Sequence, residues 1–334
     1  MSARSVAQPA RSRRRFAALA LPALLIGCTA ADGDGESAED AAVGESADAM
    51  AAALVESQLG DLLADGPSLD GSGNNVADPT LGQAGTIYPR EGAANYADGL
   101  GEPVDGPEAR YLSNRIFNDS NQNVFSENGV THWSFVWGQF IDHTIGLRES
   151  GDEDFTIAFD PNDPLEEFTN DLGDIMMTRS AVATGSGDTT PREQVNTISS
   201  YIDAWAVYGG TDERLDWLRD GVLDGDPTNN DATLLDVDGY LPTAEARPDA
   251  EAPAGDLMGR LFADPGAAVI AGDVRANENI GLTAVQTLFL REHNRIVEAL
   301  PDDLDEETKF DIARRIVVAE QQYITYTEFL EAAW

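Results

Sequence analysis

The chain has 334 residues, of which 42% are apolar and 24% are charged. It is therefore long enough for one large domain or two ordinary ones, and it can bury a sizeable core, which argues against wholesale disorder. The 60 acidic residues outnumber the 21 Lys and Arg residues and give a net charge of -39, so nucleic acid is not an expected partner. A single cysteine excludes a disulfide framework, a cysteine-based zinc site and an iron–sulfur cluster.

The first 27 residues predict an export signal. Five arginines and no acid lead into an apolar run, Phe16 to Gly27, which is shorter than the roughly 20 residues of a membrane span. The run ends in Leu25-Ile26-Gly27-Cys28, which resembles the lipobox of bacterial lipoproteins, and Ser12-Arg13-Arg14-Arg15-Phe16 resembles a twin-arginine signal. We expect lipidation at Cys28 and a protein held outside the cytoplasm, at a bacterial membrane or cell surface, by this lipid alone. The alternative is a chance basic patch beside a buried thiol.

The remaining sequence predicts a tether followed by one mainly α domain. Residues 28–53 are small and acidic and predict a solvated tether, and residues 54–334 form the expected domain. Residues 66–108, 149–190 and 210–256 are rich in turn-forming residues and predict long irregular loops with short elements. Apolar residues recur at helical spacing in three segments, Trp133 to Ile145, Leu282 to Leu300 and Glu306 to Trp334. The last pattern reaches Trp334 without a cap, and we expect a domain that is incomplete at its C-terminus.

One polar triplet lies inside the first helical pattern. Gln139, Asp142 and His143 stand at i, i+3 and i+4, so they share one side of a helix beside apolar residues. A histidine beside a carboxylate and an amide in apolar surroundings is a plausible proton acceptor. Taken alone, the triplet favours the alternative, a core histidine whose ring is satisfied by hydrogen bonds.

A second segment extends the pattern to a known family. Ala271-Gly-Asp-Val-Arg-Ala-Asn-Glu278, followed by Leu290-Arg-Glu-His-Asn-Arg295, resembles the animal-type haem peroxidases together with the triplet. The resemblance continues in the family's order through further segments, namely Asp70-Gly-Ser-Gly-Asn-Asn75, Leu112-Ser-Asn114, Ser199-Ser-Tyr-Ile-Asp-Ala204, Val207-Tyr-Gly209 and Ile324-Thr-Tyr326. It therefore covers nearly all of the expected domain and implies that family's helical fold, with a haem b cofactor.

The resemblance also implies roles for individual residues. His143 matches the distal histidine, Arg275 the distal arginine and Gln139 the distal glutamine. Asp142 and Glu278 match the two carboxylates that can become esterified to haem, whereas Asn279 cannot form the sulfonium link that a methionine gives myeloperoxidase. A base that moves the peroxide proton and a fixed cation beside the departing oxygen suit the chemistry of peroxide.

The family's calcium ligands are only partly retained. The position after the distal histidine is Thr144 instead of aspartate, and Trp205 replaces another ligand. Ser199, Tyr201 and Asp203 are the remaining candidates, with side-chain oxygens from two of them and a carbonyl from Tyr201. Calcium prefers six to eight oxygens. We expect a calcium site that is weakened or lost.

The proximal histidine of the family would lie beyond this chain, and His132 and His293 are poor substitutes. We therefore expect these 334 residues alone to bind haem badly and to be inactive. The implied function is an exported peroxidase in which hydrogen peroxide oxidises a halide, a pseudohalide or a small organic donor. The alternatives are a haem-dependent fatty-acid dioxygenase of the same fold and a non-catalytic acidic surface lipoprotein.

Overall fold

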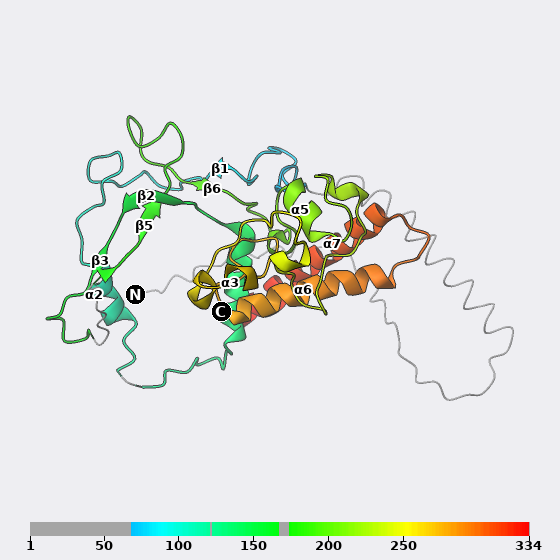
Figure 1. The fold of residues 1–334 in the computed structure, drawn as a ribbon. Helices are drawn as coiled ribbons and strands as arrows, with labels where there is room; N and C mark the ends of the chain where they lie inside the picture. The colour runs from blue at the N-terminus through cyan, green and yellow to red at the C-terminus, as the bar shows by residue number, and fades with distance from the viewer. Residues whose placement is uncertain (1–67, 121, 167–173, 334) are drawn as a thin grey trace, which may run out of the picture. The chain divides into compact units, whose positions relative to one another are not determined.

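The structure is a computed structural model that describes residues 68–120, 122–166 and 174–333 (Figure 1). The expected signal peptide at 1–27, the tether at 28–53 and Cys28 lie outside the described residues and stay predictions. Within the described part, no helix is long and apolar enough to cross a membrane. The mainly helical fold class is confirmed by this architecture.

Three long helices carry the core. They are α3 (Trp133–Ile145), α6 (Ile280–Ala299) and α7 (Glu306–Ile324). Each of the last two starts at a side-chain cap, because Asn279 accepts a hydrogen bond from the Leu282 amide and Asp305 accepts one from the Thr308 amide, both at 2.9 Å. The shorter helices are α2 (Ala109–Ile116), α4 (Trp205–Tyr208), α5 (Asp212–Leu218) and α8 (Leu330–Ala333).

Aromatic rings join the long helices. Phe140 of α3 stacks on Phe289 of α6 with ring centroids 5.3 Å apart, and both side chains are buried. His293 of α6 and Phe310 of α7 lie 5.2 Å apart by the same measure. Figure 1 shows α6 and α7 side by side, with α3 crossing near the start of α6. Burial of these rings is the main source of stability for this part of the chain.

Strands occur only as short antiparallel pairs in the described residues. The pairs are β1 (Thr86–Ile87) with β6 (Val195–Asn196), β2 (Ser150–Asp154) with β5 (Thr178–Ser180), and β3 (Ile157–Ala158) with β4 (Asp174–Ile175). The segment between α5 and α6 contains short 3-10 helices, η1 to η4. They are η1 (Pro227–Asn229), η2 (Ala244–Ala246), η3 (Gly259–Phe262) and η4 (Pro265–Ala267). Strands β1 to β5 and the turns η1 and η2 lie in segments that the sequence predicts as irregular, whereas β6, η3 and η4 lie outside those segments.

Two expectations about the helices need correction. The pattern from Glu306 onward is not one α-helix, because α7 passes into a π-helical turn, η5 (Thr325–Phe329), before α8. The Thr325 hydroxyl donates to the Gln321 carbonyl at 2.7 Å, a side-chain bond that accompanies such irregular turns. Not every residue of the apolar stripes is buried either, since Trp133 is 60% exposed and Leu288 is 59% exposed.

Candidate active site

The polar triplet of α3 lies on one side of that helix, as its spacing predicts, but at different depths. Asp142 is exposed, Gln139 is half-buried, and His143 is only 4% exposed. The buried neighbours Phe140 and Ile141 on the same helix hold the backbone against the core. The histidine is therefore the innermost of the three, and the carboxylate of Asp142 faces water.

Gln139 and His143 meet the segment that precedes α6. The Gln139 side-chain amide donates to Oε2 of Glu278 at 2.6 Å, and its own oxygen accepts from the Asn279 side chain at 2.7 Å. Nε2 of His143 lies 3.5 Å from the same Glu278 oxygen. The structure thus brings together Gln139, His143 and Glu278, which we call the distal cluster.

Arg275 is buried beneath this cluster and is already paired. Its guanidinium makes a two-point contact with the Asp273 carboxylate, with both distances at 2.8 Å, and also donates to the carbonyls of Gly146 and His143. Asp273 is 1% exposed, so the two opposite charges compensate each other in a buried place. The side chain of Arg275 therefore acts on His143 through its charge and through the backbone after α3.

Sequence reasoning missed Asp273 and Asn279. An acid two residues before a buried arginine was a usable signal for Asp273, because such spacing permits the bond from the Arg275 amide to Asp273 that the structure shows at 2.9 Å. For Asn279, only the absence of a methionine at this position was considered. Its position immediately before an apolar helical pattern is the signature of an N-cap, which the structure shows it to be.

The electrostatics of the cluster keep His143 neutral. Burial lowers the pKa of His143 to about 4, and the positive charge of Arg275 acts in the same direction. Its Nδ1 is buried without a hydrogen-bond partner and lies 3.9 Å from Asp273. Burial also raises the pKa of Glu278 above its ordinary value. At neutral pH the imidazole can therefore accept a proton.

The other two histidines differ from His143 in what their rings can do. His293 is fully buried, and both of its ring nitrogens are engaged, Nδ1 with the Tyr208 hydroxyl and Nε2 with the Ala232 carbonyl, each at 2.9 Å. His132 is exposed and caps the start of α3. His293 is thus a structural residue, and His132 lies at the opposite end of its helix from His143.

The candidate calcium ligands form a closed local network. The Ser199 hydroxyl donates to the Asp203 carboxylate at 2.5 Å, and the Tyr201 hydroxyl donates to the Leu81 carbonyl at 2.6 Å. Thr144, which is fully buried, donates to the carbonyl of Phe140 within its own helix. Burial raises the pKa of Asp203 to about 6. Across residues 68–120, 122–166 and 174–333, no three His, Cys, Asp or Glu side chains are grouped as a metal site.

Comparison with known proteins identifies the family to which this chain belongs. The family model described as animal haem peroxidase matches residues 67–333. Peroxidasin from Drosophila melanogaster is 30% identical over 304 residues, and thyroid peroxidase from Sus scrofa is 29% identical over 307 residues. These matches cover 79% and 78% of this chain but only 19% and 32% of the two relatives. The chain belongs to the animal haem peroxidase family.

Solved structures agree with this assignment. Peroxidase A from Dictyostelium discoideum has a TM-score of 0.61 and 25% identity, and the match covers 79% of this chain and 52% of that one. A fatty acid alpha-dioxygenase from Arabidopsis thaliana has a TM-score of 0.58 at 18% identity, covering 79% and 37% respectively, which shows a shared fold. The chain therefore spans about a fifth of the peroxidasins and about half of the Dictyostelium enzyme.

Proposed function

We propose that this chain supplies the distal half of a haem peroxidase centre in which hydrogen peroxide oxidises a halide, a pseudohalide or a small organic donor. Family membership supports the peroxidase class and the haem cofactor. The observation that carries the proposal is His143, a buried histidine of low pKa whose Nε2 lies 3.5 Å from Glu278. His143 differs from the also buried, structural His293, because both ring nitrogens of His293 are hydrogen-bonded whereas Nδ1 of His143 has no hydrogen-bond partner among the described residues.

The surface above His143 has the chemistry of a haem face. Phe135, Gln139 and Asp142 lie on one side of α3, and Phe135 is 60% exposed. Glu278 and Ile280, the latter 90% exposed, stand at the start of α6 close to Gln139. Apolar side chains suit a flat macrocycle, and the carboxylates of Asp142 and Glu278 are the candidates for ester links to it. The residues present on this side therefore fit haem b.

Haem, when bound, supplies the redox chemistry with peroxide. His143 takes the proton of the peroxide at its Nε2 and returns it to the departing oxygen, which a neutral imidazole can do. Arg275, oriented by Asp273, donates to the carbonyls of His143 and Gly146. Burial and, after it, the guanidinium charge lower the pKa of His143 and keep the imidazole neutral. Gln139, fixed between Glu278 and Asn279, orients a small polar molecule at the open side of His143.

Two other functions were considered for the same scaffold. A fatty-acid dioxygenase is compatible with the fold, but 18% identity to such an enzyme gives no support for its substrate. A non-catalytic lipoprotein would not require Gln139, His143 and Arg275 together at buried or half-buried positions. The distal cluster therefore favours the peroxidase. We propose further that the protein is exported and anchored through Cys28.

The test uses the protein that contains these residues, purified with its haem. It is mixed rapidly with hydrogen peroxide, and the rate of the reaction is measured. His143→Ala should slow the reaction by about 10²- to 10⁴-fold, the usual contribution of a general acid–base group. His132→Ala makes the same change at an exposed position of the same helix and should react at the parental rate. Haem content, read from the visible spectrum, should be equal in all three proteins. Parental kinetics in the His143 variant would overturn the assignment.

A further inference from the structure

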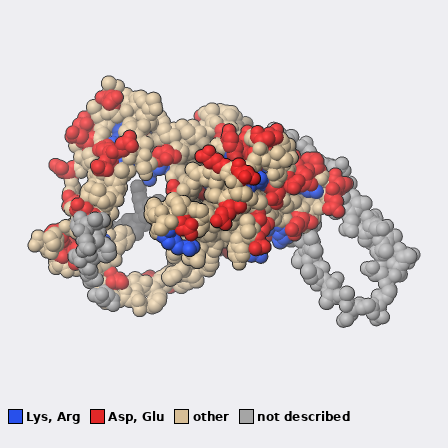
Figure 2. All heavy atoms as spheres, viewed as in Figure 1, with Lys and Arg blue, Asp and Glu red and all other residues tan. Residues whose placement is uncertain are grey.

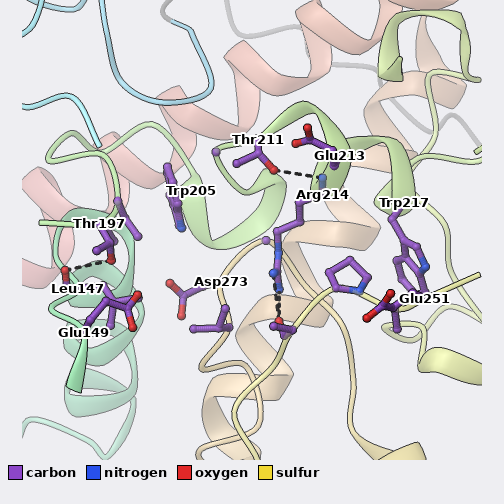
Figure 3. A pocket seen from close by; sticks show the side chains of 17 residues that line it. Leu147, Glu149, Thr197, Trp205, Thr211, Glu213, Arg214, Trp217, Glu251 and Asp273 are labelled. Carbon is purple, nitrogen blue, oxygen red and sulfur yellow. Dashed lines mark hydrogen bonds between the residues drawn. The ribbon is translucent and has the colours of Figure 1, made fainter. Parts of the chain in front are cut away.

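A cleft separate from the distal cluster remains without a role in the proposed function. It has a volume of about 540 Å³, within the range of small-molecule sites, and none of the distal-cluster residues lines it. Its walls come from the segment after α3, from α4 and α5, and from the stretches around Glu251 and Asp273, as Figure 3 shows. We propose that this cleft binds a small organic cation with an aromatic or alkyl body.

Two indole rings supply the apolar surface of the cleft. Trp205 and Trp217 lie on either side of Arg214 in Figure 3. Trp217 is 3% exposed and already has the Arg247 guanidinium 5.9 Å from the centre of its ring, so Trp205 is the indole that a ligand can contact. Trp205 is held against the backbone of Gly210, where an added Cβ would overlap its six-membered ring. Fixed indole faces attract cations more strongly than other aromatic side chains do.

The charges that line the cleft favour a ligand of positive charge. Glu149, Glu213 and Glu251 are exposed side chains that line it, whereas the charge of the buried Asp273 is compensated by its contact with Arg275. The cleft has one basic lining residue, Arg214, which donates from Nε to the Ala271 carbonyl at 2.8 Å and from both Nη atoms to the Ala254 carbonyl. Its donors thus hold two backbone segments together. An anion would meet repulsion from the carboxylates, whereas a cation would meet attraction from them.

The whole molecule carries a net charge of -39, so cations gather near it without a specific site. Figure 2 shows carboxylates over much of the face in view, with few basic groups among them. A test must therefore separate the cleft from this general attraction. Binding in the cleft requires both a carboxylate rim and an indole wall, whereas general attraction depends on net charge alone and is screened by salt.

The probes are three molecules of the same shape, namely 2-phenylethylammonium, 2-phenylethanol and phenylacetate. Calorimetric titration of the purified chain without peroxide, at about 0.15 M salt, should show the ammonium binding at one site. The neutral alcohol should bind at least several-fold more weakly, and phenylacetate should not bind. Equal binding of the ammonium and the alcohol, or no binding of either, would overturn the proposal. The result does not depend on haem or on peroxidase activity.

Variants then locate the site. Glu149→Gln and Glu251→Gln should each weaken 2-phenylethylammonium roughly threefold, in keeping with exposed ion pairs. Glu127→Gln removes the same charge from an exposed position outside the cleft and should leave the affinity unchanged. Trp205→Leu should weaken binding about two- to fivefold through loss of the cation–π contact, while Trp205→Phe retains most of it. Equal effects of the Glu127 and Glu149 variants would show general attraction only and refute the cleft.

Discussion

At the scale of single residues, the ring nitrogens of His293 define its protonation state. The Ala232 carbonyl can only accept, so Nε2 carries the proton, and Nδ1 accepts from the Tyr208 hydroxyl. This arrangement satisfies a neutral imidazole completely. A second proton would reverse the Tyr208 bond, with Nδ1 donating to the hydroxyl oxygen, and would leave a charge in a buried place. Burial accordingly lowers the pKa of His293 to about 4.

This histidine predicts a pH dependence of stability. The folded pKa of about 4 lies below the ordinary value of 6.5, so the unfolded chain binds the proton more readily. The free energy of unfolding should fall as the pH drops from about 6.5 to about 4, by on the order of 3 kcal/mol from this residue. His293→Gln should reduce the slope of that part of the curve in urea titrations at each pH, while His143, whose pKa is also about 4, contributes with the same sign in both proteins. Asp203, whose pKa is raised to about 6, contributes to the pH dependence of stability with the opposite sign. It is present in both the parental protein and the His293→Gln variant.

The cap at Asn279 gives a second prediction. Its side chain accepts from the Leu282 amide and donates to Gln139, so it stabilises the start of α6 and fixes the glutamine at once. Asn279→Ala should lower the free energy of unfolding by about 1 kcal/mol, the usual effect of losing an N-cap. Asn279→Asp keeps the acceptor and should retain most of that stability in denaturant titrations. Equal losses in both variants would assign the stabilisation to the Gln139 bond instead of the cap.

Two members of the distal cluster could be predicted from the sequence, because helical spacing puts Gln139 and His143 on one side of a helix together with Asp142. The depth of each side chain could not, since it depends on contacts from α6 that are far away in sequence. The pairing of Arg275 with Asp273, only two residues earlier, was missed for a different reason. A resemblance assigns a role to an arginine, whereas only coordinates show which acceptors its donors already have.

At the scale of elements, the loop from Ser199 to Trp205 is held by hydrogen bonds between its own residues. Ser199 bonds to one Asp203 oxygen, and the Trp205 amide lies 3.3 Å from the other. Thr144 uses its hydroxyl within α3. The side-chain oxygens of Thr144, Ser199 and Asp203 are thus hydrogen-bonded within the protein, and Trp205 supplies no side-chain oxygen, whereas calcium prefers six to eight oxygen ligands.

We therefore expect the protein to hold no calcium that resists chelation. A chelator should leave the melting temperature unchanged, and elemental analysis should find less than one calcium per chain. The double variant Thr144→Asp with Trp205→Ser restores two oxygen ligands at these positions and should gain a calcium-dependent rise in melting temperature. One tightly held calcium in the parental protein, retained after chelation, would contradict the prediction.

The helices show how accurately hydrophobic periodicity predicts where a helix begins and ends. The pattern from Leu282 to Leu300 predicts α6 to within two residues at its start and one at its end, because an Asn cap and a proline bound it. The π-helical turn after Ile324 could not be predicted, since its cause is a local bond from Thr325 together with packing of Trp137, whose indole N–H lies 3.3 Å from the Thr325 hydroxyl. The short strand pairs were missed because strands of two to five residues carry no measurable alternation of apolar and polar side chains.

At the scale of the whole molecule, the export signal is still a prediction. The only cysteine follows an apolar run of lipobox type, and it lies outside the described residues. In a bacterial host, Cys28→Ser should shift the protein from the membrane fraction or leave it as an unprocessed precursor. Unchanged fractionation and unchanged size would refute the anchor. Cys28→Ala should behave in the same way, since neither side chain can accept the lipid.

Iron ligation is the property that depends most on the molecule as a whole. The three histidines of the sequence are His132, which is exposed, His143 in the distal cluster, and His293, whose two nitrogens are already bonded. A haem that rests on the distal cluster therefore finds no second imidazole among these 334 residues to hold its iron from the opposite side. We expect haem titration of this chain to give weak binding without the sharp Soret band of histidine-ligated haem. Added imidazole should strengthen the band by supplying the missing ligand. A stoichiometric Soret band that His132→Ala abolishes would show instead that this exposed histidine reaches the iron.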